Sequence, residues 1–250
     1  LGWCYINKVK FYSALISFEK VLVQYKNVEL KNLPESLNKT DVRSDALIAI
    51  VWPFSELTKK QLKKSKLPRH RPLEYFRYLS PNKTAYLKAL KKLGRRLTLK
   101  QRNIAATKVY FELLRQSSEL TDRIDLIERL YVAMKNTQTQ WPVRGFVEEI
   151  TKTLPQIKYS TTLKKPMKKK LFFDYEIYAR DVATRQDKHS RAVKIKEEYQ
   201  RSIKDYKNYL WAFRKKKYRP RIQVNMADLY KLAGMNVEAG KAYEKISKTK

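Results

Sequence analysis

Histidine and cysteine, which often serve as bases, nucleophiles and metal ligands, are scarce in this chain. Its two histidines are His70 and His189, and its single cysteine is Cys4. His70 stands between two arginines, and neither histidine belongs to an H-E-x-x-H or related spacing of metal ligands. We expect Cys4 to fill a packed helix as a small apolar side chain. These residues therefore predict neither a metal centre nor a Cys–His nucleophile.

Two pairs of neighbouring carboxylates are the remaining candidates for acid–base chemistry, at Glu148–Glu149 and Glu197–Glu198. Neighbours on a helix point about 100 degrees apart, so we expect these carboxylates to be solvated separately. Glycine-rich phosphate loops are absent from the sequence, which has only 5 glycines. We therefore expect no enzymatic activity and no cofactor.

The charge balance is the strongest functional signal. Lysine and arginine number 56 against 24 aspartate and glutamate, which gives a formal net charge of +32. Such an excess repels itself and favours an anionic partner: an acidic protein, an anionic lipid or wall polymer, or nucleic acid. The alternative is a solvated surface biased towards lysine by genome composition. That alternative explains many lysines but not so few carboxylates.

Basic residues gather at four places, two of which we assign to an acidic partner. The two sets that we do not assign to a partner lie around the break at Pro68 and in the stretch 164–170. The first assigned set has helical spacing and comprises Lys88, Lys91, Lys92, Arg95 and Arg96. The second follows an apolar helical stretch and comprises Arg214, Lys215, Lys216, Lys217, Arg219 and Arg221. Trp211 and Phe213 flank it, where they would either stack on a ligand or pack in the core.

The elements that must position these residues are predicted to be helices. No segment alternates between apolar and polar residues as a half-buried strand does, and proline and cap residues divide the chain into helical stretches. Thr40 and Ser80 are predicted to cap two of them, and Thr121–Asp122 a third. We expect helices at Asp41–Val51 (ending before Pro53), Pro81–Arg96, Arg123–Met134, Pro142–Thr153 (before Pro155), Leu171–Gln186 and Ser190–Arg214, with a basic loop at 156–170.

The two ends of the chain share one pattern of small and apolar residues. At the start, the spacing predicts a helical hairpin that turns at Asn7–Lys10. Aligning Ala14 with Ala239 places Phe18 on Tyr243 and Tyr5 on Tyr230. The middle keeps the same offsets, with the residues Leu93, Gly94, Leu97, Ala106 and Tyr110. Small residues at these positions let two helices approach closely.

This pattern resembles the tetratricopeptide repeat, whose sequence runs L-G-x-x-Y and then A-x-x-x-F/Y. Leu1, Gly2, Tyr5, Ala14 and Phe18 match it. The resemblance implies an all-α solenoid of stacked antiparallel helical hairpins. It further implies a scaffold or adaptor role, in which a concave groove accepts a partner protein. We expect repeats over 1–155, the loop at 156–170, and over 171–250 a long hairpin followed by a terminal repeat.

A looser similarity concerns the order of the segments 45–57, 72–81, 87–97 and 102–114. It resembles long tetratricopeptide proteins of Gram-negative bacterial envelopes, which implies a periplasmic or envelope-associated location. The cytoplasm is the alternative, since a single cysteine fits both compartments. No run of about 18 apolar residues predicts a membrane-spanning helix. The sequence opens on Leu1, so we expect a segment of a larger scaffold protein that binds acidic partners, and a nucleic-acid-binding helical repeat is the alternative function.

Overall fold

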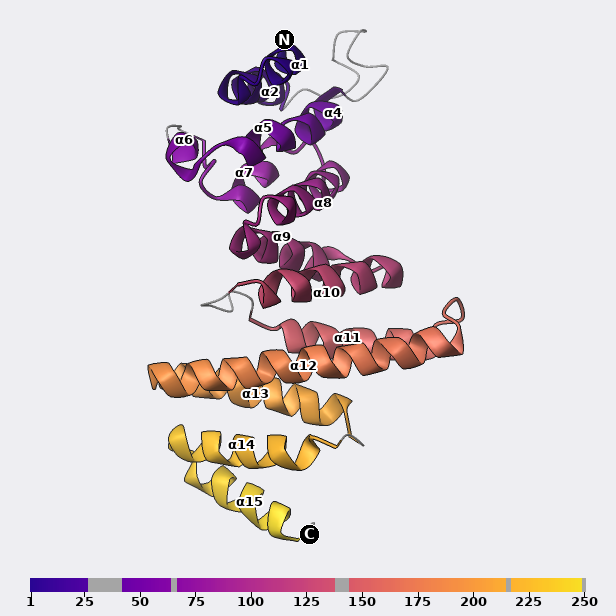
Figure 1. The fold of residues 1–250 in the computed structure, drawn as a ribbon, viewed down its shortest axis with the longest axis vertical. Coiled ribbons are helices and arrows are strands. Elements are labelled where there is room, and N and C mark those ends of the chain that lie inside the picture. Colours follow the sequence, from indigo (N-terminus) through magenta and orange to yellow (C-terminus); the bar gives the residue numbers. More distant parts are fainter. Residues whose placement is uncertain (27–41, 64–66, 138–143, 215–216, 249–250) are drawn as a thin grey trace. The chain divides into compact units, whose positions relative to one another are not determined.

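The computed structural model describes residues 1–26, 42–63, 67–137, 144–214 and 217–248, and their regular structure is entirely α-helical (Figure 1). The predicted all-α class is therefore confirmed. The chain divides into two compact units, Leu1–Gln116 with Val132–Thr137 and Ser117–Tyr131 with Gln138–Lys250. Helix α10 (Leu120–Lys135) supplies residues to both. Within the described residues, every helix is too short or too polar to cross a membrane.

In the first unit, helices near and far in the sequence pack on one another, and the core includes an aromatic cluster. Phe54, Tyr75 and Phe76 are buried, with ring centroids 5.1–5.2 Å apart. Helix α8 packs against α4, α5, α7 and α9, and α2 packs against α1, α4 and α5. The helices of this unit are α1 (Gly2–Asn7), α2 (Phe11–Gln24), α4 (Val42–Ala49), α5 (Val51–Glu56), α6 (Lys59–Lys63), α7 (Pro72–Leu79), α8 (Lys83–Leu99) and α9 (Asn103–Gln116).

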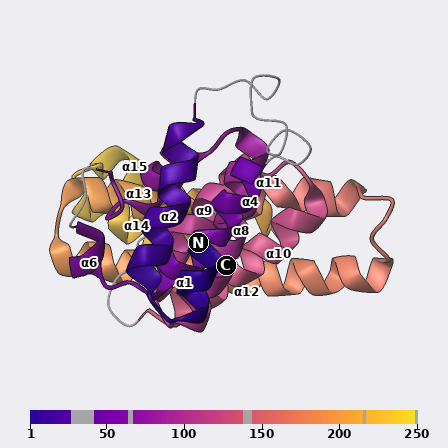
Figure 2. The same cartoon turned by 90° about the horizontal axis from the view of Figure 1, so that it is seen from above.

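The second unit is a series of helices in which each packs on the next. Its helices are α11 (Phe146–Tyr159), α12 (Lys165–Val193), α13 (Lys196–Ala212), α14 (Arg219–Leu232) and α15 (Asn236–Ser247). The long helix α12 packs against both α11 and α13, which also contact each other, and α14 lies against both α13 and α15. Figure 2 shows the turn that joins the end of α11 to the start of α12. The core here combines aliphatic side chains with buried tyrosines and alanines, among them Tyr206, Tyr209, Ala179 and Ala183.

Three hairpins, α1–α2, α8–α9 and α14–α15, turn in the same way. Each first helix ends with a residue in the left-handed region, at Val9 (φ 56°), Gln101 (φ 54°) and Gly234 (φ 75°). The amide of that residue donates to the carbonyl three residues back, and the next amide donates to the carbonyl five residues back, at 2.8–3.0 Å. This is the Schellman arrangement, which satisfies carbonyls that a helix end leaves unpaired. The shared offsets predicted from the sequence therefore correspond to one shared turn.

Glycine lets two of these hairpins close tightly. A Cβ atom built on Gly2 would lie 2.5 Å from Phe18 Cζ, and one built on Gly94 would lie 2.5 Å from Tyr110 Cε1. Carbon atoms in contact ordinarily lie about 3.5–4 Å apart, so no larger residue fits without moving the ring. The glycine and the aromatic residue sixteen positions later thus fix the separation of the two helices. The close approach that we predicted from the small residues is confirmed at both positions.

Of the two prolines that we predicted to end helices, only Pro155 fails to do so, because α4 ends at Ala49, ahead of Pro53. Pro53 lies in the first turn of α5, where the missing amide hydrogen would have had no partner within the helix. Pro155 lies inside α11, which continues to Tyr159. Burial of Leu154 and Ile157 on either side of Pro155 favours helix continuation over the break that proline alone would cause. Thr40, Asp41 and Pro142, which we assigned to helix starts, lie outside the described residues.

Three predicted boundaries are also wrong. The side chain of Asn82, not Ser80, caps α8, accepting from the amide of Ala85 at 2.8 Å. Helix α10 begins at Leu120, so Thr121 and Asp122 lie in its first turn. The predicted loop 156–170 is helical except at 160–164. Lys168, which we placed in that loop, lies in α12 and donates to the carbonyls of Lys158 and Ser160, at the end of α11.

The division between the two long helices lies further along the chain than we predicted. Helix α12 continues through His189 and Ser190 to Val193, and the left-handed residue Lys194 (φ 56°) ends it. Ser190 is buried, so tertiary packing holds the chain helical where the sequence alone shows a weak apolar pattern. Cys4 is another correction, because it is exposed rather than packed in a helix interface.

Candidate binding surface

Five of the described carboxylates are buried, and two of them, Glu149 and Glu198, are ones that we predicted to be solvated. Glu19, Glu149, Glu176, Asp187 and Glu198 are buried. Each accepts hydrogen bonds from other helices: Tyr75 donates to Glu19, Tyr209 to Glu176 and Tyr206 to Asp187, at 2.6–2.8 Å. Burial and the adjacent Glu19 charge raise the pKa of Tyr75 well above its ordinary value. These five carboxylates therefore join helices instead of facing solvent.

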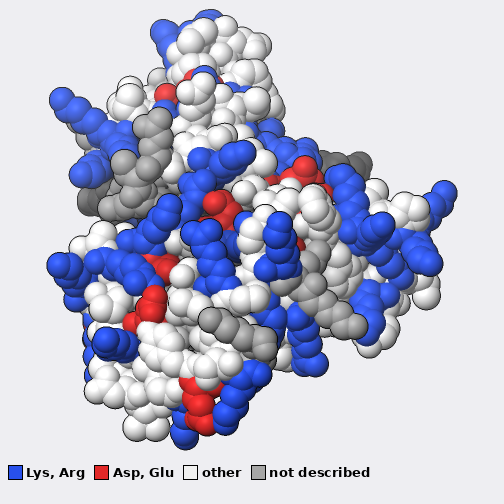
Figure 3. All heavy atoms as spheres, turned by 60° about the horizontal axis from the view of Figure 1, so that its bottom comes forward, with Lys and Arg blue, Asp and Glu red and all other residues white. Residues whose placement is uncertain are grey.

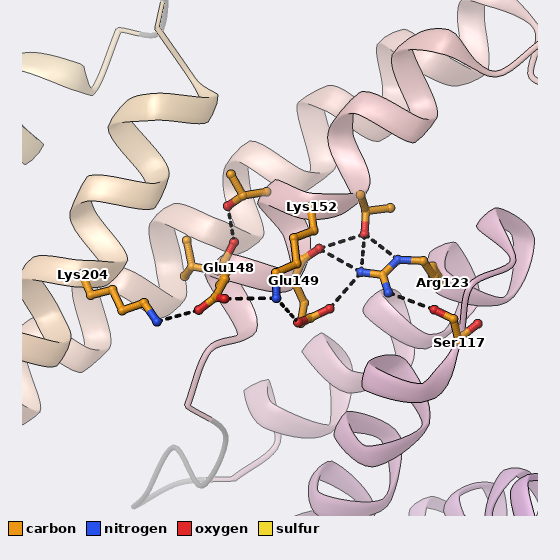
Figure 4. A network of polar contacts seen from close by, with 9 residues as sticks. Ser117, Arg123, Glu148, Glu149, Lys152 and Lys204 are labelled. Atoms are coloured by element: carbon orange, nitrogen blue, oxygen red, sulfur yellow. Dashed lines mark hydrogen bonds and ion pairs between the residues drawn. The ribbon is translucent and has the colours of Figure 1, made fainter.

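Figure 4 shows one such network within the second unit. Arg123 donates to Glu149 at 2.9 Å, to Thr153 and to the carbonyl of Ser117, and its side chain is buried. Lys152 lies 3.0 Å from both Glu148 and Glu149. Lys204 of α13 pairs with Glu148 at 2.7 Å. The hydrogen bonds from Lys204 and Lys152 hold the pKa of Glu148 below its ordinary value. The predicted carboxylate pair is thus a structural link between α10, α11 and α13.

Lysine side chains have the opposite distribution. Every lysine in the described part of the chain is at least partly exposed, whereas the buried cations are Arg43, Arg69 and Arg123. Figure 3 shows lysine and arginine spread across the visible face, with carboxylates in small groups. The excess positive charge is therefore presented to solvent. Arg69, which we counted among the basic residues near Pro68, instead donates to the buried Glu19.

The predicted stripe on α8 is divided between internal and outward roles. Lys88 and Arg95 are exposed, and Lys91 and Lys92 are half-buried. Arg96 pairs with Glu56 at 2.6 Å, donates to Ser55 at 2.9 Å and lies over the Trp52 ring. Lys88 and Arg95 are therefore available to a partner, whereas Arg96 holds α8 against α5.

Burial and charge tune the groups beside this stripe. Burial raises the pKa of Glu56, but hydrogen bonds from Lys100 and Arg96 outweigh it, and the net shift is downward. Burial together with the Arg96 charge lowers the pKa of Lys92. Glu56 thus remains ionised and neutralises part of the stripe. Of the five residues predicted for this stripe, Lys88 and Arg95 are the exposed ones.

The second predicted set lies around the turn from α13 to α14. Arg214, Lys217 and Arg221 are exposed, and Arg219 donates from its guanidinium to the carbonyl of Leu210. Lys215 and Lys216 lie outside the described residues. Of the two flanking aromatics, Phe213 is buried and Trp211 is 57% exposed. The structure thus separates the two roles that the sequence left open for this pair.

Arg214 and Arg219 line a cleft of about 390 Å³ formed by α13, α14 and α15. Two further cations line it, Lys207 of α13 and Lys245 of α15. Its apolar lining comprises Leu210, Trp211, Met226, Ala242 and Ile246. Among the described residues that line this cleft there is no carboxylate. The cleft therefore combines an apolar surface with positive charge.

Sequence reasoning missed Lys207 and Lys245 as members of this site. Lys207 and Trp211 are four positions apart, so they share one face of α13, and Arg214 follows just after the end of that helix. That spacing was a usable signal. Lys245 comes from a helix two elements further on, and no local pattern connects it to Arg214. Lys217 and Arg221, which we grouped with Arg214, do not line the cleft.

Within the described residues, no group of histidine, cysteine, aspartate or glutamate is arranged to hold a metal ion. Comparison with known proteins adds no family assignment, because no family model and no curated protein matches the chain.

Proposed function

We propose that this protein is a non-enzymatic scaffold that binds acidic proteins through its basic helical surface. The sorting of charge carries the proposal: buried carboxylates join the helices, while the lysines lie on the surface. A chain that needed charge only for solubility could balance both signs on its surface, as most proteins do. The self-repulsion of a net charge of +32 is instead relieved when a partner supplies carboxylates.

The scaffold part of the proposal is supported by the repeated hairpin. The shared turns at Val9, Gln101 and Gly234, and the matched glycine–aromatic contacts in two of the hairpins, are features expected of repeated units. On this proposal the hairpins belong to a tetratricopeptide-like solenoid. The partner would then be bound by side chains from several helices, and no reaction would be catalysed.

A pull-down compares the wild-type chain with the variant Lys88→Glu/Arg95→Glu. The bait is incubated with nuclease-treated extract of the source cells at low and at high salt, and bound proteins are identified by mass spectrometry. We expect a defined acidic protein that the wild-type chain retains and the variant retains less. Both substituted residues are exposed, so the variant should keep the wild-type circular dichroism spectrum.

The same experiment without nuclease tests the alternative function. If the chain retains nucleic acid and no defined protein, and the nucleic acid is released by salt, the scaffold proposal fails. Binding through phosphates falls steeply with salt because counterions are released on association. Equal recovery of the same acidic protein by the wild-type chain and by the variant would exclude the α8 residues from the binding surface.

A further inference from the structure

We propose that the cleft between α13, α14 and α15 binds an acidic peptide segment of a protein partner. One apolar side chain of that segment, with carboxylates on both sides of it in the peptide, covers the apolar lining of the cleft. This inference depends on the proposed function and assigns it a specific site. One face of each of three helices contributes to the cleft. Its volume of about 390 Å³ lies within the range of pockets that bind ligands.

The cations around the cleft are positioned for carboxylates. Arg219 is held by its hydrogen bond to the Leu210 carbonyl, and Lys207 lies 5.6 Å from the centroid of the Tyr230 ring. The hydrogen bond orders the Arg219 side chain before a ligand arrives, so less entropy is lost on binding. Arg214 is exposed at the cleft and offers the planar fork that binds a carboxylate with two parallel hydrogen bonds.

The apolar lining selects a peptide rather than a free anion. Trp211 is 57% exposed although it adjoins the buried Leu210 and Phe213, so its ring offers contact area that the core does not use. Met226 and Ile246 lie across the cleft from α13 and add aliphatic surface. An occupant that pairs only charges would leave this surface in water, whereas a leucine-sized side chain would cover it.

Nucleic acid fits this lining less well than a peptide does. Strands bound without base pairing stack successive bases on a series of aromatic side chains along a basic track. Trp211 is the aromatic residue among the described residues that line the cleft, and its neighbours there are aliphatic. Charge complementarity and aliphatic lining together favour a peptide that carries carboxylates on both sides of an apolar residue.

Fluorescence anisotropy tests the inference with a labelled peptide that has one leucine between two runs of glutamate. Arg214→Glu and Trp211→Ala should each weaken binding about tenfold, because each removes a central contact. Replacing the peptide's leucine with serine should weaken binding to the wild-type chain and should have little effect in the Trp211→Ala variant. Lys108→Glu is the matched control, since it changes the charge by the same amount at an exposed residue of α9 that belongs to neither proposed binding surface.

The outcomes distinguish this inference from the proposed function. If Arg214→Glu and Lys108→Glu weaken binding equally and Trp211→Ala has no effect, the cleft is not the site, although the chain still binds acidic peptides. If the wild-type chain does not bind the peptide, this inference is overturned, and the pull-down decides the broader function. If a single-stranded oligonucleotide displaces the peptide from the cleft at physiological salt, the cleft is a nucleic-acid site instead.

Discussion

Replacing Gly94 with alanine should destabilise the first unit, although alanine is the better helix former. In a helix interior, alanine is favoured over glycine by about 1 kcal/mol. At Gly94, however, the added Cβ would lie 2.5 Å from Tyr110 Cε1 and 3.0 Å from two further ring atoms. Tyr110 is 1% exposed, and its hydroxyl lies 3.1 Å from Thr98 Oγ1, so the ring has little room to move.

Overpacking of this kind costs typically about 1–3 kcal/mol, and the short contact places Gly94 at the upper end. After the gain in helix propensity, the net loss should be about 2 kcal/mol. Gly240 is the matched control, because it lies inside α15 and a Cβ there meets no atom within 4 Å. Gly240→Ala should therefore stabilise the second unit by up to about 1 kcal/mol.

Urea denaturation followed by far-UV circular dichroism measures both free energies of unfolding, with a separate fit for each unit if the transitions do not coincide. In a Tyr110→Leu background the cost of Gly94→Ala should largely disappear, since the ring that causes it is gone. The reasoning would be refuted if Gly94→Ala stabilised the protein as Gly240→Ala does. In that case the glycine would not set the separation of α8 and α9.

Three further predictions concern stability. Gln101→Gly should raise the free energy of unfolding by about 0.5–1 kcal/mol, because the left-handed backbone strains any other residue, and an unchanged urea midpoint would contradict this. Arg123→Met should lower it by about 3 kcal/mol by leaving Glu149 buried without its main partner, and Arg123→Met/Glu149→Leu should recover most of the loss. Burial raises the pKa of Asp205 to about 7, so the folded state binds a proton that the unfolded state releases. This contribution to stability is complete below about pH 4 and is lost as the pH rises to about 7, by at most about 1.4 kcal/mol per pH unit. Asp205→Asn should flatten this part of the pH profile of unfolding, and an unchanged profile would contradict it.

The elements that could be predicted from the sequence are those fixed by local contacts. Gly2 and Phe18 belong to consecutive helices of one hairpin, so their spacing in the sequence is enough to predict that they are in contact. Pro155 and Ser190 were misinterpreted because neighbours from other helices bury the surrounding residues and keep the chain helical. Local propensity is a weak signal where tertiary packing opposes it.

The candidate site was predictable where one helix supplies it. Trp211 and Arg214 were both noted in the sequence, and the structure places both at one cleft. Whether an aromatic residue is buried or exposed depends on the helices that pack around it, so the sequence left Trp211 and Phe213 equivalent. Arg96 was assigned to the outer surface because Glu56, its partner, lies forty positions earlier. Ion pairs of that separation have no signature in a local pattern of charge.

Calorimetric titration of the wild-type chain with polyglutamate and with a single-stranded oligonucleotide of equal charge tests the central claim most directly. At physiological salt, we expect polyglutamate to bind, and Lys88→Glu/Arg95→Glu/Arg214→Glu to weaken that binding. The oligonucleotide should bind more weakly than polyglutamate and lose affinity faster as salt is added. Tighter binding of the oligonucleotide, or no binding of either polymer, would contradict the claim that the exposed lysine and arginine side chains serve an acidic protein partner.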